Sequence, residues 1–120
     1  DTYWNSNYLQ TVNKMCDMYF KHSMENCLLI VDKKKSYDLR LNGDFGMSGN
    51  TLYNVNKNYI YTGCQIINKK LFNGFSKKFF SVSEIWNKKL NQNDLYGEDS
   101  KEEFIHLTDL EIYNKLLENN

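Results

Sequence analysis

The stretch that decides the fold of this chain is NCLLIVD, residues 26–32. Five consecutive apolar residues, 27–31, have the length of a strand. The apolar run is continuous rather than alternating, which is typical of a strand that is covered on both faces. The sequence therefore predicts a buried, central strand over 26–32, with the other elements packed around it.

An amphipathic helix is predicted before this strand, over residues 6–22, with Asn5 or Ser6 as its cap. Its apolar residues recur at helical spacing, and they predict a buried stripe made of Tyr8, Leu9, Val12, Met15, Cys16, Tyr19 and Phe20. A polar loop follows the central strand over residues 33–43. Residues 44–55 then carry Gly46 and Gly49 around a short turn, which predicts a β-hairpin.

The second half of the chain contains two strands and two helices in alternation. Residues 58–67 form the strongest strand pattern, and 102–108 predict one more strand. Ser81 and Thr108 each begin a capping-box sequence. The two helices that follow should bury Val82, Ile85, Trp86 and Leu90 in the first, and Leu110, Tyr113, Leu116 and Leu117 in the second. Helices and strands mixed in this order predict an α/β fold with a mixed sheet and flanking helices.

Composition excludes several classes of function. The chain has 120 residues, so it is one domain or part of one, and its 15 basic and 15 acidic residues balance. A balanced charge gives no electrostatic footprint for nucleic acid. The apolar runs are too short to span a bilayer. Three cysteines without a C-x-x-C pair predict reduced, buried thiols in a cytoplasmic protein.

Two positions stand out as candidate site residues on their own. His106 lies in an apolar strand just before a helix, and ligands in open α/β sheets gather at the carboxyl ends of strands. The alternative is a core histidine that bonds a backbone carbonyl. Gly63 lies within a strand, which indicates either a bulge or close approach of a ligand to the backbone. The alternative there is a small residue beneath a packed helix. The chain has no Gly-rich phosphate loop, G-x-S-x-G or H-E-x-x-H motif, and no paired Cys/His metal spacing.

Six motifs follow one another across most of the chain: LLIVD (28–32), NGDFGM (42–47), YIYTGCQIINKKLF (59–72), FSVSEIWNKKL (80–90), LYG (95–97) and FIHLTDLE (104–111). In order and spacing they resemble the C-terminal half of the sugar-1-phosphate nucleotidyltransferases. The most similar branch contains N-acetylmuramate α-1-phosphate uridylyltransferase and mannose-1-phosphate guanylyltransferase-like proteins. The opening DTYW resembles the family's Asn-Gly/Ser-Asp strand end, cut at its aspartate, Asp1. The resemblance therefore implies a partial Rossmann-like nucleotidyltransferase fold, in which residues 1–120 are the acceptor-sugar side and the nucleotide-binding half is absent.

The resemblance also implies a reaction and a set of site residues. The intact enzyme would transfer a nucleoside monophosphate from a nucleoside triphosphate to a sugar 1-phosphate, with Mg²⁺ as its cofactor. Asp1 and His106 fall on the family's metal-binding positions. Thr62 and Gly63 would line the acceptor-sugar pocket, and Asp32 and Lys57 would also bind substrate. A missing N-terminal half would be the natural protein partner.

Departures from the family pattern leave a second function open. The family's Gly-Thr-Pro-Glu is replaced by residues 108–111, without the glycine, and only Lys57 remains of its Glu-Lys-Pro motif. Imidazole is also a poorer Mg²⁺ ligand than carboxylate, so His106 could instead bind a phosphate or a metal-bound water. The alternative function is a non-catalytic remnant or interaction module that keeps only the fold.

Overall fold

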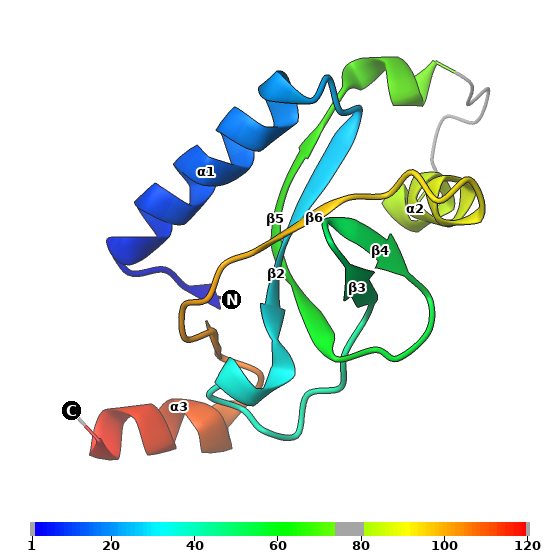
Figure 1. Ribbon diagram of the computed structural model, residues 1–120. Helices are drawn as coiled ribbons and strands as arrows, with labels where there is room; N and C mark the ends of the chain where they lie inside the picture. The colour runs from blue at the N-terminus through cyan, green and yellow to red at the C-terminus, as the bar shows by residue number, and fades with distance from the viewer. Residues whose placement is uncertain (1, 74–80, 120) are drawn as a thin grey trace.

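The computed structural model describes residues 2–73 and 81–119. Its centre is a three-stranded mixed sheet with strand order β5–β2–β6 (Figure 1). The middle strand, β2 (Asn26–Asp32), pairs antiparallel with β5 (Tyr59–Ile67) and parallel with β6 (Gly97–Asp99). Each side chain from Cys27 to Val31 has no exposed surface. The predicted central strand is confirmed, and the chain has an α/β architecture.

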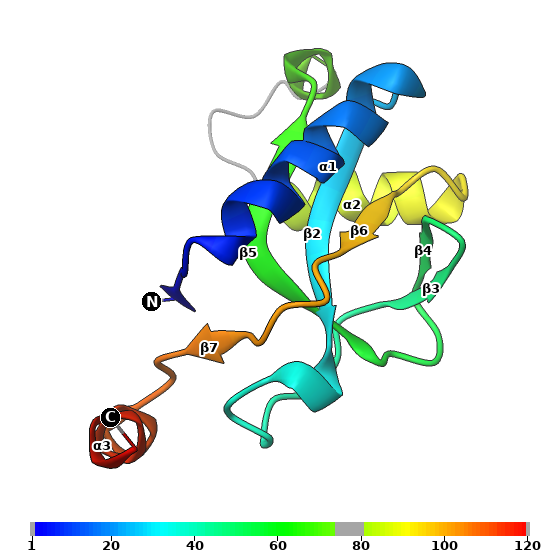
Figure 2. The same cartoon turned by 60° about the vertical axis from the view of Figure 1, so that its left-hand side comes forward.

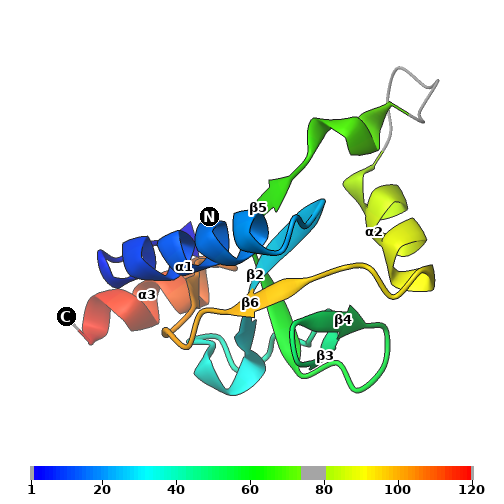
Figure 3. The same ribbon diagram turned by 45° about the horizontal axis from the view of Figure 1, so that its top comes forward.

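The two faces of β2 belong to two different cores. Cys27 and Leu29 point toward α1 (Asn7–Lys21) and pack with Tyr8, Met15 and Tyr19 of that helix. Leu28 and Ile30 point to the other face, where their neighbours include Phe45, Leu52, Leu95, Trp86 and Leu90. Figure 3 shows α1 and the small β3–β4 sheet on opposite sides of the central strands. This double coverage explains why β2 is apolar at every interior position.

Two elements on the second face were predicted well. The hairpin consists of β3 (Gly46–Ser48) and β4 (Thr51–Tyr53), which pair antiparallel across a two-residue turn. α2 (Val82–Asn91) is capped by Ser81, whose side chain accepts a hydrogen bond from the Ser83 backbone N–H. Phe80, the first residue of the predicted helix motif, lies outside the described residues.

A second two-stranded sheet lies on the other side of the central strands from β3 and β4 (Figure 2). β1 (Thr2–Tyr3) pairs antiparallel with β7 (Ile105–His106), so that Thr2 stands opposite His106. The predicted strand over 102–108 is thus only two residues long. α3 (Leu110–Glu118) follows it. This pairing places the beginning of the described chain next to the last strand.

Three sequence expectations are corrected. β6 was missed, because only three residues form it and the buried Asn26 side chain fixes its approach through hydrogen bonds with Asp94 and Tyr96. The N-cap of α3 is Asp109 rather than Thr108, since the Asp109 carboxylate accepts a hydrogen bond from the Ile112 N–H. The predicted helix stripes are partly wrong: exposed apolar side chains include Leu9, Phe20, Leu110, Tyr113 and Leu117.

The predicted apolar stripes were too wide because each helix packs against the rest of the chain through only part of its apolar surface. α1 packs through Tyr8, Thr11, Met15 and Tyr19, a narrower stripe than the apolar pattern predicted. In α3 only Ile112 is buried, and the helix extends from the end of the molecule (Figure 1). Among residues 2–73 and 81–119, no helix combines the length and apolar character needed to traverse a bilayer.

Candidate functional site

A cavity of about 420 Å³ lies where β5, β7 and the loop after η1 (Lys33–Lys35) meet. Three of the residues that the sequence singled out, Thr62, Gly63 and His106, line it together. The remaining lining residues are Thr2, Leu41, Asn42, Asp44, Ile60, Tyr61 and Phe104. The fold therefore brings candidate residues from distant parts of the chain to one place.

His106 is half-buried and is held on two sides. Its Nδ1 lies 3.3 Å from the Thr2 hydroxyl, the partner that the β1–β7 register places opposite it. Its ring stacks on Phe104, with 5.9 Å between ring centroids. Burial lowers the pKa of His106, and the charge of Asp38 partly opposes that shift. The imidazole is therefore mainly neutral at pH 7, and its bonded neighbour is a hydroxyl rather than the backbone carbonyl of the core alternative.

Thr62 and Gly63 form a bulge in β5. The β2–β5 register shifts between Leu28 and Ile30, opposite this point. The buried Thr62 hydroxyl donates to the Leu29 carbonyl at 2.8 Å and accepts from the Cys64 N–H at 3.4 Å. Gly63 has φ +97°, and a Cβ built there would meet no atom within 4 Å. The bulge interpretation is confirmed, and a glycine packed beneath a helix is excluded among the described residues.

Asp32 and Lys57 are not among the residues that line the cavity. The Asp32 carboxylate accepts a hydrogen bond from the Lys34 N–H at 2.9 Å and so caps η1. Lys57 is exposed, and its backbone carbonyl lies against Gly43. Both residues have local structural roles, and their binding of substrate stays a prediction.

Asp1 lies outside the described residues, although its neighbour Thr2 lines the cavity. In the described part of the chain, no group of three or more His, Cys, Asp or Glu side chains is placed to hold a metal ion. Proteins usually hold Mg²⁺ through one or two carboxylates together with substrate phosphates, so binding of Mg²⁺ by Asp1 and His106 stays a prediction.

Asp44 lines the cavity although neither the predicted hairpin over 44–55 nor the NGDFGM motif (42–47) implied a role for its carboxylate. Its Oδ2 accepts a hydrogen bond from the Tyr61 N–H at 2.9 Å. Its own N–H donates to the Tyr59 carbonyl at 2.7 Å. The sequence signal for Asp44 was a carboxylate in the segment between the predicted strands over 26–32 and 58–67. The sequence could not show that this segment folds against β5.

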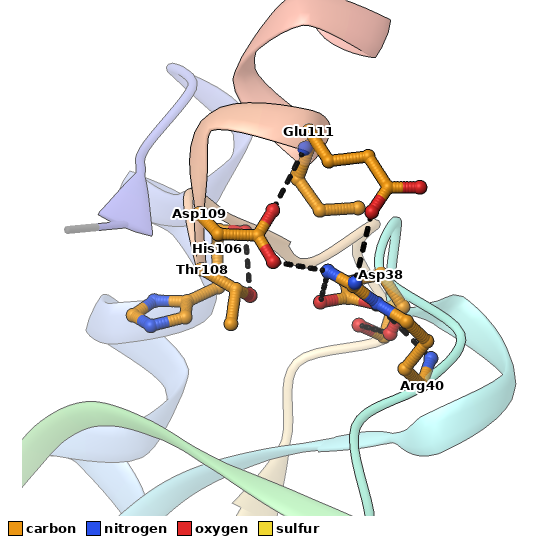
Figure 4. Close-up of polar contacts among 8 residues, drawn as sticks. Asp38, Arg40, His106, Thr108, Asp109 and Glu111 are labelled. Carbon is orange, nitrogen blue, oxygen red and sulfur yellow. Dashed lines mark hydrogen bonds and ion pairs between the residues drawn. The ribbon is translucent and has the colours of Figure 1, made fainter.

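A charged cluster beside β7 was also missed (Figure 4). Arg40 Nε donates to Asp38 Oδ1 at 2.8 Å, and its two Nη atoms reach Asp109 at 3.0 Å and Glu111 at 3.3 Å. The hydrogen bonds from Arg40 hold the pKa of the buried Asp38 well below its usual range, and those from Asp38 and Asp109 raise the pKa of Arg40. This cluster fixes the loop after η1 to the start of α3.

The three cysteines are free thiols, as predicted, but only Cys27 is buried. Burial raises its pKa to about 12. Cys16 and Cys64 are half-buried.

Comparison with known proteins gives no family assignment: no protein-family model matches the chain, and no curated protein matches it.

Proposed function

We propose that this chain is the acceptor-sugar side of a sugar-1-phosphate nucleotidyltransferase domain. In the complete enzyme, a phosphate oxygen of the sugar 1-phosphate attacks the α-phosphorus of a nucleoside triphosphate. A new P–O bond forms, the bond between the α-phosphorus and the bridging oxygen breaks, and pyrophosphate leaves. The products are a nucleoside diphosphate sugar and pyrophosphate.

The shared cavity is the single observation that carries this proposal. Gly63 and His106 were singled out by their positions in the sequence and Thr62 by the family resemblance, and all three line one volume of about 420 Å³. That volume lies within the range of roughly 300–1,000 Å³ that small-molecule sites occupy. The lining mixes polar groups with apolar side chains such as Ile60 and Phe104, as sites for sugars and their phosphates require.

His106 would hold the phosphate of the acceptor sugar. When the Thr2 hydroxyl donates to Nδ1, at 3.3 Å, the neutral ring carries its proton on Nε2. Nε2 has no protein partner among the described residues and can donate to a phosphate oxygen. Such positioning contributes strongly to transfer reactions that need little acid-base chemistry. Thr62 shapes the wall instead, because its hydroxyl is already bonded on both sides.

The remaining parts of the proposal come from the resemblance. Mg²⁺ would bind chiefly to substrate phosphates, with Asp1 and His106 beside it, and the nucleotide-binding half would be the protein partner. The enzyme would act in the cytoplasm on small molecules rather than on nucleic acid or membranes. The free thiols of the chain are compatible with a reducing compartment.

Binding of acceptor sugars tests the proposal directly. We expect hexose 1-phosphates to bind the chain without any nucleotide, measured by calorimetry, and His106→Ala to weaken that binding about tenfold or more, as removal of a charge-assisted hydrogen bond does. His22→Ala is the matched control, because His22 is exposed at the end of α1. The chain alone should release no pyrophosphate from triphosphates. Failure of every hexose 1-phosphate to bind would reject the proposed function.

A non-catalytic interaction module is the second candidate. The observation that favours it is the apolar surface of α3, where Leu110, Tyr113 and Leu117 are 70%, 45% and 57% exposed. Exposed apolar stripes of this kind are typical of protein contacts. The calorimetric experiment separates the two candidates, since an interaction module has no reason to bind hexose 1-phosphates through His106.

A further inference from the structure

We propose that Asp44 binds ring hydroxyls of the acceptor sugar and selects among sugars in this cavity. The inference rests on the proposed function, since it assumes that a sugar 1-phosphate occupies the site. The NGDFGM motif (42–47) contains Asp44 without implying a role for it, and its position in the folded chain suggests one.

The backbone holds Asp44 firmly against β5. Its N–H donates to the Tyr59 carbonyl at 2.7 Å, and its neighbour Phe45 exchanges backbone hydrogen bonds with the same residue, at 3.1 and 3.0 Å. The carboxylate is fixed as well, because Oδ2 accepts from the Tyr61 N–H at 2.9 Å. A side chain held at both its backbone and its carboxylate is preorganised for binding.

One carboxylate oxygen remains free for a ligand. Oδ1 of Asp44 has no hydrogen-bond partner among residues 2–73 and 81–119, while Asp44 lines the cavity beside Asn42. An ionised carboxylate only accepts hydrogen bonds. Its ligand must therefore bring donors, and the hydroxyl groups of a sugar ring are donors of the right kind.

Charge determines which part of the ligand faces Asp44. A carboxylate repels the phosphate of a sugar 1-phosphate, so Asp44 suits the neutral ring. His106 and Thr2 offer uncharged polar groups in the same cavity, and Leu41, Ile60 and Phe104 offer apolar surface to the C–H face of a sugar. This division of chemistry assigns the phosphate to His106 and the ring hydroxyls to Asp44.

The variant Asp44→Asn tests this assignment. It keeps an oxygen that can accept from the Tyr61 N–H but removes the charge. We expect affinity for hexose 1-phosphate to fall about tenfold or more, as expected for a hydrogen bond to a charged group, with no loss of affinity for inorganic phosphate. Asp17→Asn, the same change on the exposed face of α1, should leave both affinities unchanged. If hexose 1-phosphates bind but Asp44→Asn behaves as Asp17→Asn, the inference is wrong while the proposed function stands.

Deoxy analogues of the bound hexose 1-phosphate sharpen the test. Removal of the hydroxyl that Asp44 binds should weaken binding to the unsubstituted protein and cause no further loss in Asp44→Asn. Equal losses in both proteins at every ring position would overturn the inference.

The unsubstituted protein supplies a readout that does not depend on the folding of a variant. The Tyr61 amide donates to Asp44, so its NMR signal should shift on addition of hexose 1-phosphate but not of inorganic phosphate. An unmoved Tyr61 signal at saturation would also overturn the assignment. If no hexose 1-phosphate binds at all, this inference and the proposed function fail together.

Discussion

Asp38 shows how one side chain can hold two distant parts of the molecule together. It is 1% exposed, and Arg40 bonds both of its carboxylate oxygens, at 2.8 and 3.0 Å. Arg40 in turn reaches Asp109, the cap of α3. In the sequence, Arg40 is the only arginine, which was the one available signal. Its partners Asp109 and Glu111 lie about 70 positions later, and no local pattern identifies them.

The lowered pKa of Asp38 predicts that replacing its carboxylate destabilises the chain by an amount that depends on pH. The Asp38 pKa is lower in the folded chain than the value of about 3.9 expected after unfolding. Its stabilising effect is therefore fully present above about pH 4 and is lost as the pH falls through the folded pKa. We expect Asp38→Asn to lower the free energy of unfolding by about 1–2 kcal/mol at pH 7, since water screens the half-exposed Arg40.

Urea unfolding of both proteins at pH 7 and at pH 3 measures this effect. The difference in the free energy of unfolding should narrow at pH 3, because Asp38 is then largely protonated in the unfolded original chain, which favours its unfolding, and the variant has no such group. Asp17→Asn, at an exposed position, should change stability little at either pH. If the two proteins differed in their free energy of unfolding by the same amount at pH 7 and at pH 3, the charge of Asp38 would not stabilise the fold as described.

At the scale of elements, the β5 bulge and the β3–β4 turn offer a comparison of two glycines. Gly63 in the bulge has φ +97° and Gly49 in the hairpin turn has φ +60°. A Cβ would meet nothing within 4 Å at either position, so only the backbone conformation opposes a side chain. The value at Gly49 is close to the left-handed region that other residues visit, whereas that at Gly63 lies well outside it.

We therefore expect Gly63→Ala to destabilise the chain more than Gly49→Ala. Strained backbone conformations cost about 1–3 kcal/mol, and Gly49→Ala should fall at the lower end of that range. Thermal unfolding followed by circular dichroism compares the two variants. Equal stability of Gly63→Ala and the original chain would mean that the bulge relaxes on substitution.

The elements that the sequence predicted are those with strong local patterns. β2 is apolar and buried from Cys27 to Val31, and the Ser81 cap precedes α2 as its capping box indicated. β6 could not be found in this way, and β7 is shorter than the strand predicted over 102–108. The segments that contain them are held by partners elsewhere in the chain: Leu28 donates to the Tyr96 carbonyl at 2.8 Å, and Phe104 donates to the Lys35 carbonyl at 2.9 Å.

At the scale of the whole molecule, the candidate site was predicted only in part for the same reason. Gly63 and His106 stood out by their positions in predicted strands, and the family resemblance added Thr62, so the sequence could select all three. Asp44 reaches the cavity only because it and its neighbour Phe45 form backbone hydrogen bonds with Tyr59, the first residue of β5. Contacts between elements, rather than patterns within them, complete the site.

The outer side of β5 leads to the last prediction. β5 is an edge strand of the central sheet. A mainly apolar groove of about 670 Å³ runs between it and the start of α1, where Trp4 and Leu9 are 43% and 67% exposed. In the proposed complete domain, the nucleotide-binding half would cover this side.

Edge strands and apolar surfaces without a cover favour association, so we expect the chain to bind a hydrophobic dye and to self-associate in sedimentation experiments. Leu9→Glu should reduce both effects without loss of stability, because Leu9 is already largely exposed. Gln10→Glu introduces the same charge at an exposed position that does not line the groove, and it should leave dye binding unchanged. A monomer that binds no dye would contradict the expectation that this side of the sheet is covered in the complete enzyme.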